Sequence, residues 1–179
     1  MGIVPKHRYV LGFMFDRDYA EVALILKNRP AWQAGKWNGI GGKIEGDETP
    51  HAAMVREFTE ETYLVGTRDL HENLIVPDWK QVGYRFRAPL DATDDRGYEM
   101  FVFACTWANI DEVDYNYRDE DSAAVYDVPE TPDPRRERVL ISDVSDRIET
   151  FGVPGLAGTV YMAKAALIEG FQFSVEDPQ

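Results

Sequence analysis

The segment that most constrains this chain is GGKIEGDETPHAAMVREFTEETYL, residues 41–64. Thr49 is a favoured N-cap residue, and Pro50 suits the first helical position because no amide hydrogen is needed there. The segment therefore predicts a helix over about residues 50–62, and this helix follows directly on a glycine-rich loop.

Three glutamates gather on one face of this predicted helix. When each residue advances by about 100°, Glu57, Glu60 and Glu61 fall within an arc of about 100°. Arg56 lies beside them and precedes Glu60 by four residues. The opposite face carries a largely apolar stripe, which we expect to pack on a core and which consists of Ala52, Val55, Phe58 and Thr62.

The clustered carboxylates need a physical explanation, because the chain already has a formal net charge of −13. Like charges at helical spacing repel by roughly 0.2–0.5 kcal/mol per pair on an exposed helix. One interpretation is a solvated polar face. The other is that the glutamates share one or two divalent cations, since Mg²⁺ prefers oxygen ligands and is commonly bound by carboxylates together with substrate phosphates.

The acidic composition also limits the partners that we expect. An isoelectric point of about 4.6 argues against general binding to the nucleic-acid backbone, which requires Lys and Arg facing phosphates. No segment approaches the roughly eighteen apolar residues needed to span a bilayer, and the single Cys105 excludes an internal disulfide. We therefore expect a cytoplasmic protein with a small-molecule ligand, no membrane and no long nucleic acid.

The remaining sequence predicts strands around the acidic helix and further helices near its end. Apolar, β-rich runs with turn signals between them occupy residues 8–15, 21–26, 72–76, 82–87 and 99–107. The proline-rich segment 127–138 predicts a connector, followed by helical patterns at about 139–150 and 156–169. This order predicts a single α+β domain over residues 1–179, with helices packed on a mixed sheet.

The spacing of the acidic segment resembles the Nudix box, G-x5-E-x7-R-E-U-x-E-E-x-G-U, where U is a bulky aliphatic residue. The matching positions, over residues 42–64, are Gly42, Glu48, Arg56, Glu57, Phe58, Glu60, Glu61 and Leu64. Tyr63 departs from the box, whose final glycine usually takes a left-handed conformation that costs a tyrosine roughly 1–2 kcal/mol. The resemblance implies the Nudix fold, an α/β/α sandwich around a mixed β-sheet.

Nudix proteins similar to this one hydrolyse a nucleoside diphosphate linked to a further group X, using Mg²⁺ or Mn²⁺. The resemblance implies that Arg56 orients the glutamates by charge-assisted hydrogen bonds and that Glu48 is a structural partner of the site. It also makes Glu57 our candidate for the base that takes the proton of a water molecule. The implied metal ligands within the segment are the Gly41 carbonyl, Glu57, Glu60 and Glu61.

The family often adds an acidic metal ligand from outside the box. In the segment NYRDEDSAAVYDVP this candidate is Glu120, with Asp119 and Asp121 as alternatives. The competing interpretation of these residues is a solvated acidic loop.

The substrate is inferred from the segment KWNGIGGKIE, which is similar to that of MutT-like enzymes acting on oxidised purine nucleoside triphosphates. The similarity implies that Asn38 recognises a base edge, whereas the alternative is a turn residue before Gly39. Trp37 is either a stacking wall or a core residue, and Lys43 either meets a phosphate or faces water. The paired acids with which that subgroup also recognises the base have no clear counterpart near the last helix.

We therefore expect a Mg²⁺-dependent enzyme that cleaves a nucleoside triphosphate, with an oxidised purine such as 8-oxo-dGTP as the first candidate, to monophosphate and pyrophosphate. The alternatives are a Nudix enzyme acting on ADP-ribose, a dinucleoside polyphosphate or an mRNA cap, and a Nudix module that senses a nucleotide without cleaving it.

Overall fold

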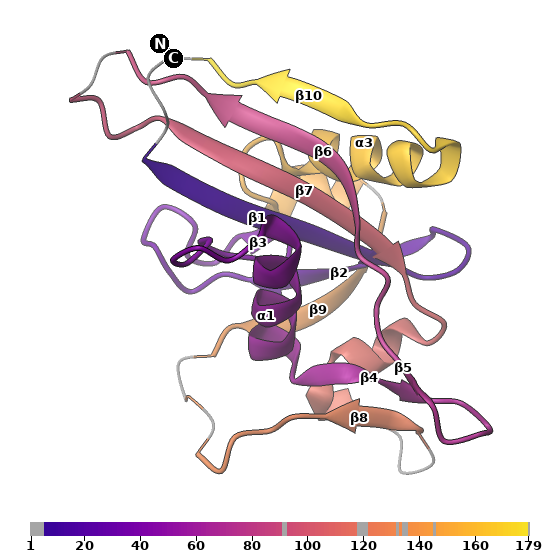
Figure 1. Ribbon diagram of the computed structural model, residues 1–179. Helices are drawn as coiled ribbons and strands as arrows, with labels where there is room; N and C mark the ends of the chain where they lie inside the picture. The colour runs from indigo at the N-terminus through magenta and orange to yellow at the C-terminus, as the bar shows by residue number, and fades with distance from the viewer. Residues whose placement is uncertain are drawn as a thin grey trace.

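A mixed sheet of seven strands lies at the centre of the computed structural model, which describes residues 6–90, 93–117, 122–131, 133, 136–144 and 146–178 (Figure 1). The strand order is β10-β6-β7-β1-β2-β3, and β9 pairs with β2. β1 runs parallel to β7 and β10 parallel to β6, whereas the other pairs are antiparallel. The strands are β1 (His7–Phe15), β2 (Glu21–Leu26), β3 (Trp37–Asn38), β6 (Lys80–Arg87), β7 (Tyr98–Thr106), β9 (Arg138–Asp143) and β10 (Phe173–Glu176).

A smaller sheet and several helical segments complete the described structure. The small sheet has the order β5-β4-β8, formed by β4 (Leu64–Arg68), β5 (Leu74–Ile75) and β8 (Ala124–Tyr126). Two short 3₁₀ segments, η1 (Ile110–Val113) and η2 (Tyr115–Tyr117), lie between β7 and β8 in the chain. The α-helices are α1 (Pro50–Thr62), α2 (Asp146–Phe151) and α3 (Leu156–Glu169). Among the residues that the structure describes, none of the helices is long and apolar enough to cross a membrane.

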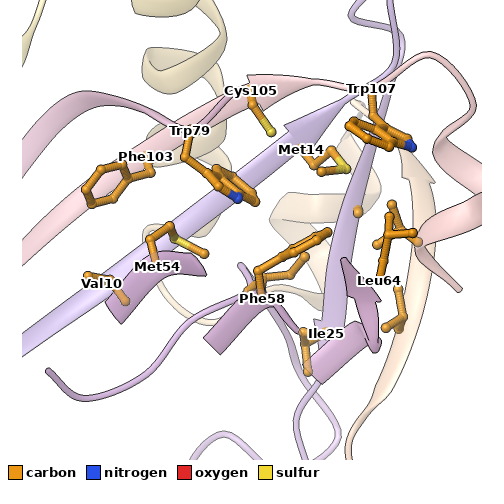
Figure 2. Packing of buried hydrophobic residues seen from close by; sticks show 14 of the residues in the cluster. Val10, Met14, Ile25, Met54, Phe58, Leu64, Trp79, Phe103, Cys105 and Trp107 are labelled. Carbon is orange, nitrogen blue, oxygen red and sulfur yellow. The ribbon is translucent and has the colours of Figure 1, made fainter. Parts of the chain in front are cut away.

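Helices cover both faces of the large sheet, which confirms the predicted α/β/α sandwich. α1 packs on one face and α3 on the other, as Figure 1 shows. The two side-chain directions of β1 separate the two cores: Val10 and Met14 join the α1 side, and Phe13 joins the α3 side. On the α1 side, Phe58 meets the Trp79 ring edge-on at 5.3 Å between ring centroids, with Met14 close by (Figure 2).

The helix predicted over residues 50–62 is confirmed, but half of its predicted apolar stripe is wrong. The Thr49 hydroxyl caps α1 by accepting from the Ala52 amide at 3.2 Å. Ala52 and Val55 are exposed, and the buried residues are Ala53, Met54, Phe58 and Thr62. The inward face is therefore turned toward Met54 and Phe58, and it includes Glu57 and Glu61. This orientation of the helix has a physical reason, because the glycine-rich loop beside it supplies a hydrogen-bond donor to a carboxylate on the inward face. The pattern of apolar residues in the helix does not show this donor.

The helix predicted at 139–150 is also wrong in its first half. Residues Arg138–Asp143 form β9, which pairs antiparallel with β2 from Leu26↔Arg138 to Glu21↔Asp143. Val139 faces the α1 side, and Leu140 packs on the α3 side, so the apolar residues alternate with the period of a strand. A short apolar run permits either period, and pairing along the full length of β2 decides for the strand.

Two further elements differ from expectation, and one helix agrees with it. α3 coincides with the predicted helix at 156–169. The predicted strand at 72–76 shortens to β5, whose two residues are exposed. The polar tail contains a strand, β10, which extends the sheet by pairing in parallel with β6.

The glycine-rich loop is inserted between β1 and β2, and this insertion builds the candidate site. The two strands pair directly only at Met14↔Ala23 and Phe15↔Val22. Beyond that point the loop fills the gap, since the Gly12 amide donates to the Ile40 carbonyl at 2.7 Å. Gly41 has a φ of 148°, and a Cβ there would lie 2.2 Å from a backbone carbonyl oxygen of β1. Only glycine fits this close approach, which holds the loop beside α1.

Candidate functional site

A cleft of about 510 Å³ opens beside the carboxylate-bearing side of α1. We call it the carboxylate cleft. Its lining includes Glu57, Glu60 and Glu61 of α1, Tyr63 at the end of the helix, and Arg136 and Glu137 before β9. The structure thus brings the three predicted glutamates into one cavity and adds residues that lie more than seventy positions away in the sequence.

Arg56 connects the outer part of this cleft to the glycine-rich loop. Its Nη1 donates to Glu57 Oε1 at 2.9 Å and to Glu60 Oε2 at 3.2 Å. Its Nη2 and Nε donate to the two carboxylate oxygens of Glu48 at 2.7 and 3.2 Å, and Nη2 also reaches the Lys43 carbonyl at 3.0 Å. The hydrogen bonds from Arg56 are the main reason that the pKa of Glu48 is lowered. Arg56 therefore fixes the directions of two carboxylates of the cleft, while Glu48 fixes Arg56.

Glu57 and Glu61 are the inner carboxylates, and Glu60 is the outer one. The side chains of Glu57 and Glu61 are 14% and 15% exposed, against 60% for Glu60. Glu57 approaches the loop so closely that a Cβ on Gly42 would lie 2.4 Å from Glu57 Oε1. Burial raises the pKa of Glu57, and the hydrogen bond from Arg56 opposes this rise.

Glu61 is the most strongly perturbed carboxyl group of the cleft. Its Oε2 accepts from the Gly41 amide at 2.9 Å, and its Oε1 lies 3.6 Å from the Nζ of Lys27. Burial raises the pKa of Glu61 to about 7, although Lys27 and the Gly41 amide favour the charged form. The carboxylate of Glu61 thus carries a desolvation cost that these two partners only partly offset.

Lys27 and Glu137 form an ion pair at this site that the sequence analysis missed. Lys27 Nζ contacts Glu137 Oε2 as well as Glu61, and Glu137 Oε1 accepts from the Asn28 amide at 2.9 Å. Glu137 is only 8% exposed. The pair depends on the register of β9 against β2, in which Leu26 faces Arg138. A prediction of β9 as a strand paired with β2 would have placed Glu137 beside Lys27.

The donor chemistry of this cleft suits a divalent cation, although the chain's own cations now hold the carboxylates. Within the described part of the chain, no group of three His, Cys, Asp or Glu side chains is arranged to hold an ion. The reason is that Arg56 holds Glu57 and Glu60, and Lys27 holds Glu61. Carboxylate oxygens are the ligands that Mg²⁺ prefers, and a cation would offset the desolvation of the inner pair. The residues present therefore fit such an ion once these side chains rotate toward it.

A second cleft, of about 720 Å³, begins at the glycine-rich loop and extends over the sheet toward α3. We call it the apolar cleft. Its lining includes Leu11, Asn38, Gly41, Tyr98, Met100 and Leu156. Lys27 also lines it, and Arg29 lines both clefts. The hydrogen bond between Gly41 and Glu61 joins the two clefts, because Gly41 belongs to one lining and Glu61 to the other.

Asn38 lines the apolar cleft, but its amide already has partners. Its Oδ1 accepts from the Gly39 amide at 2.8 Å, as the turn alternative predicts, and its Nδ2 donates to Gln33 Oε1 at 3.1 Å. Gln33 and the largely exposed Trp32 line the same cleft and were missed by the sequence analysis. Their position in a loop before β3 gives no periodic signal that would have marked them.

Two other predicted residues lie elsewhere, and a third lies outside the described residues. Trp37 packs on Phe151 at 5.1 Å between ring centroids and joins the core on the α3 side. It lines neither of the two clefts, so its position agrees with a core residue. Lys43 is exposed and also lines neither cleft. Glu120, with the alternatives Asp119 and Asp121, lies outside the described residues.

Comparison with protein families gives a match that includes helix α1 as well as most strands of the central sheet. The family model of the NUDIX domain matches residues 5–143, which include every strand of the central sheet except β10, the glycine-rich loop and the whole of α1. The chain belongs to the Nudix family.

Individual relatives support the fold. A CTP pyrophosphohydrolase of Escherichia coli (strain K12) is 40% identical over 60 residues, which cover 32% of this chain and 42% of that protein. The mutator MutT protein of Bacillus halodurans has a TM-score of 0.56 at 17% identity, covering 95% of this chain and 89% of that chain. The NUDIX domain of Shewanella oneidensis NrtR, complexed with ADP-ribose, has a TM-score of 0.58 at 15% identity, covering 89% and 87%.

Proposed function

We propose that this Nudix protein is a Mg²⁺- or Mn²⁺-dependent pyrophosphohydrolase that cleaves a nucleoside triphosphate to the monophosphate and pyrophosphate. The observation that carries the proposal is the junction of the two clefts at Gly41 and Glu61. A nucleoside in the apolar cleft would extend its phosphates past Gly41 into the carboxylate cleft. The substrate is a free nucleotide, and we place the protein in the cytoplasm, without a membrane or long nucleic acid as partner.

Glu57, Glu60 and Glu61, with the carbonyl of Gly41 and an acid from outside the box such as Glu120, would hold the divalent ions. The bound ions would supply Lewis-acid stabilisation of the charge that develops on the phosphate oxygens. Arg56 orients the carboxylates through the hydrogen bonds described above. Glu57 takes the proton from the attacking water. Burial raises the pKa of Glu57 toward neutral pH, and a general base works best when its pKa lies near the pH of the reaction.

An oxidised purine such as 8-oxo-dGTP is the first candidate base, by the similarity of the loop to MutT-like enzymes. Asn38 would present its amide to the base edge from the apolar cleft, and its second Nδ2 hydrogen remains available for this contact. Trp32 offers an exposed ring on the same cleft for stacking on a base. Lys43 would have to turn from solvent to reach a phosphate.

A second candidate is CTP, because the E. coli relative named above is a CTP pyrophosphohydrolase. A base edge with acceptors and an amino group could also be recognised by the paired Asn38 and Gln33 amides. ADP-ribose, dinucleoside polyphosphates and capped nucleotides are the further alternatives.

The test is a panel of nucleotides incubated with Mg²⁺ or Mn²⁺, followed by identification of the products. The panel contains 8-oxo-dGTP, the ordinary triphosphates including CTP, ADP-ribose, a dinucleoside polyphosphate and a cap analogue. We expect pyrophosphate and a monophosphate from a triphosphate, with no turnover after chelation. Turnover of ADP-ribose alone would assign another substrate class, and tight binding without turnover of any nucleotide would identify a sensing module.

A further inference from the structure

Tyr63 occupies the position at which the Nudix box has glycine, and it adopts the conformation of that glycine. Its φ is 65°, in the left-handed region, and its amide closes α1 by donating to the Thr59 carbonyl at 2.7 Å. For a residue other than glycine this conformation costs roughly 1–2 kcal/mol. The chain thus retains the glycine geometry while placing an aromatic ring at the end of α1.

The ring of Tyr63 is fixed in place by its neighbours. It is only 6% exposed and meets Tyr115 edge-on at 5.6 Å between ring centroids. The Tyr63 carbonyl accepts from the Asp127 amide at 2.8 Å, which ties the helix end to the segment after β8. The ring therefore forms a rigid surface on the wall of the carboxylate cleft.

Arg136 lies over this surface. Its guanidinium carbon is 4.2 Å from the centroid of the Tyr63 ring, and its Nη1 donates to the Glu61 carbonyl at 3.4 Å. An arginine in such a stacked position loses little conformational freedom when it binds a ligand. Both residues line the carboxylate cleft together with Glu57, Glu60 and Glu61.

The partners of Arg136 differ sharply from those of Arg56. Arg56 donates to Glu48, Glu57 and Glu60, so its charge is neutralised by the protein. Arg136 forms no ion pair with a carboxylate among the residues that the structure describes, although the net charge of the chain is −13. Its outward N–H groups are therefore available for an anion in a cleft where Arg56 and Lys27 engage the three glutamates of α1. Asp127 and Asp133 also line this cleft.

We propose that Arg136 binds the phosphates distal to the nucleoside, and that Tyr63 is the residue that positions it. Arg136 lines the carboxylate cleft and not the apolar cleft, so it lies at the end of the site opposite to the base. A guanidinium donates two parallel hydrogen bonds to phosphate oxygens. This assignment rests on the proposed function and sharpens it: the site selects a nucleotide whose distal group is a pyrophosphate over one whose distal group is a sugar phosphate.

The first test measures binding of inorganic pyrophosphate in the presence of Mg²⁺ by calorimetry. We expect Arg136→Gln to weaken pyrophosphate binding by at least about tenfold, because a bidentate charge-assisted contact is lost. Arg136→Lys should bind more tightly than Arg136→Gln but less tightly than wild type, since lysine retains the charge but lacks the paired N–H donors of a guanidinium. Arg68→Gln is the matched control, because Arg68 pairs with Glu72 and lines neither cleft. Binding by Arg136→Gln as tight as by wild type would overturn the proposal.

The second test separates Tyr63 as a positioning residue from Tyr63 as a structural one. Tyr63→Gly suits the backbone at φ 65° and removes the surface under Arg136, whereas Tyr63→Phe keeps the ring. We expect Tyr63→Phe to bind pyrophosphate like wild type, and Tyr63→Gly to bind it several-fold more weakly when both are measured well below their melting temperatures, since loss of the buried ring also lowers stability. Tight binding by Tyr63→Gly would overturn the positioning role.

Steady-state kinetics separate a failure of this inference from a failure of the proposed function. With a triphosphate substrate we expect Arg136→Gln to raise KM more than it lowers kcat, and the same variant to have no such effect on ADP-ribose turnover. If wild type hydrolyses no nucleotide but binds pyrophosphate through Arg136, the proposed function fails and this inference stands. If wild type hydrolyses a triphosphate and Arg136→Gln does so with the same KM, the inference fails and the proposed function stands.

Discussion

The two clefts that meet at Gly41 differ in how they are built. The glutamates of the carboxylate cleft come from a single helix, and Arg56 and the adjacent loop fix them at short range in the sequence. The apolar cleft is assembled from β1, the glycine-rich loop, β6, β7 and the start of α3. A fixed spacing of residues in the sequence can encode the glutamates of the carboxylate cleft, but it cannot encode the lining of the apolar cleft. This difference explains why the chemistry of the chain is easier to infer than its substrate.

The comparison predicts that changes in the three glutamates of the carboxylate cleft affect every substrate equally. We expect Glu60→Gln and Glu61→Gln to lower turnover by roughly 10²-fold or more, since each removes a group that stabilises developing charge. Initial rates on the best substrate and on a poor one provide the measurement. A variant that retains more than about a tenth of the wild-type rate would remove that glutamate from the metal site. Arg68→Gln is again the control, because Arg68 lies outside both clefts.

The buried position of Glu61 predicts a smaller effect, on the free energy of unfolding, whose size depends on pH. Its pKa in the folded chain is raised to about 7, so the stability that it contributes is present at low pH and is lost as the pH rises through 7. In metal-free protein, Glu61→Gln should therefore be more stable than wild type above pH 7, by on the order of 2 kcal/mol. The glutamine retains an acceptor for the Gly41 amide.

Denaturant unfolding in a chelating buffer, at pH values from 5 to about 8, measures this difference. The excess stability of Glu61→Gln should shrink as the pH falls toward 5. Glu60→Gln is the control, because Glu60 is the exposed member of the three. An excess stability that is the same at both ends of the pH range would show that desolvation of Glu61 is not its cause.

In the apolar cleft we expect the smallest effect, and it should depend on the base. Asn38→Ala should cost about 1 kcal/mol of discrimination, the lower end of the range for a bidentate amide–base contact, because Gly39 and Gln33 already occupy part of the amide. The ratio of kcat/KM for purine and pyrimidine triphosphates measures it. An equal loss on both would mean that Asn38 holds the turn and does not contact the base.

The residues that could be predicted from the sequence are those that a local pattern encodes. Thr49 and Pro50 fixed the start of α1, and the spacing of Glu57, Glu60 and Glu61 located the carboxylate cleft. The alternating runs located the long strands of the central sheet. The mixed sheet with helices packed on it followed from this order of elements, whereas the sandwich was implied by the resemblance to the Nudix box.

The residues that could not be predicted depend on long-range pairing. β9 was mistaken for a helix because its apolar run is short, and only its pairing with β2 selects the extended form. Without this strand, the ion pair between Lys27 and Glu137 could not be predicted. The inward turn of Glu57 and Glu61 was missed because a helical wheel ranks residues by hydrophobicity, whereas the loop at Gly41 supplies polar partners to that face.

The most direct test of the central claim is a calorimetric titration of Mn²⁺ into wild type and into the triple variant Glu57→Gln, Glu60→Gln, Glu61→Gln. The claim is that these three carboxylates of the carboxylate cleft hold the divalent ions. We expect saturable binding to wild type, accompanied by a rise in melting temperature because the ions bind only the folded chain, and loss of both in the triple variant. Equal Mn²⁺ binding by the two proteins would contradict the claim and place the ions elsewhere.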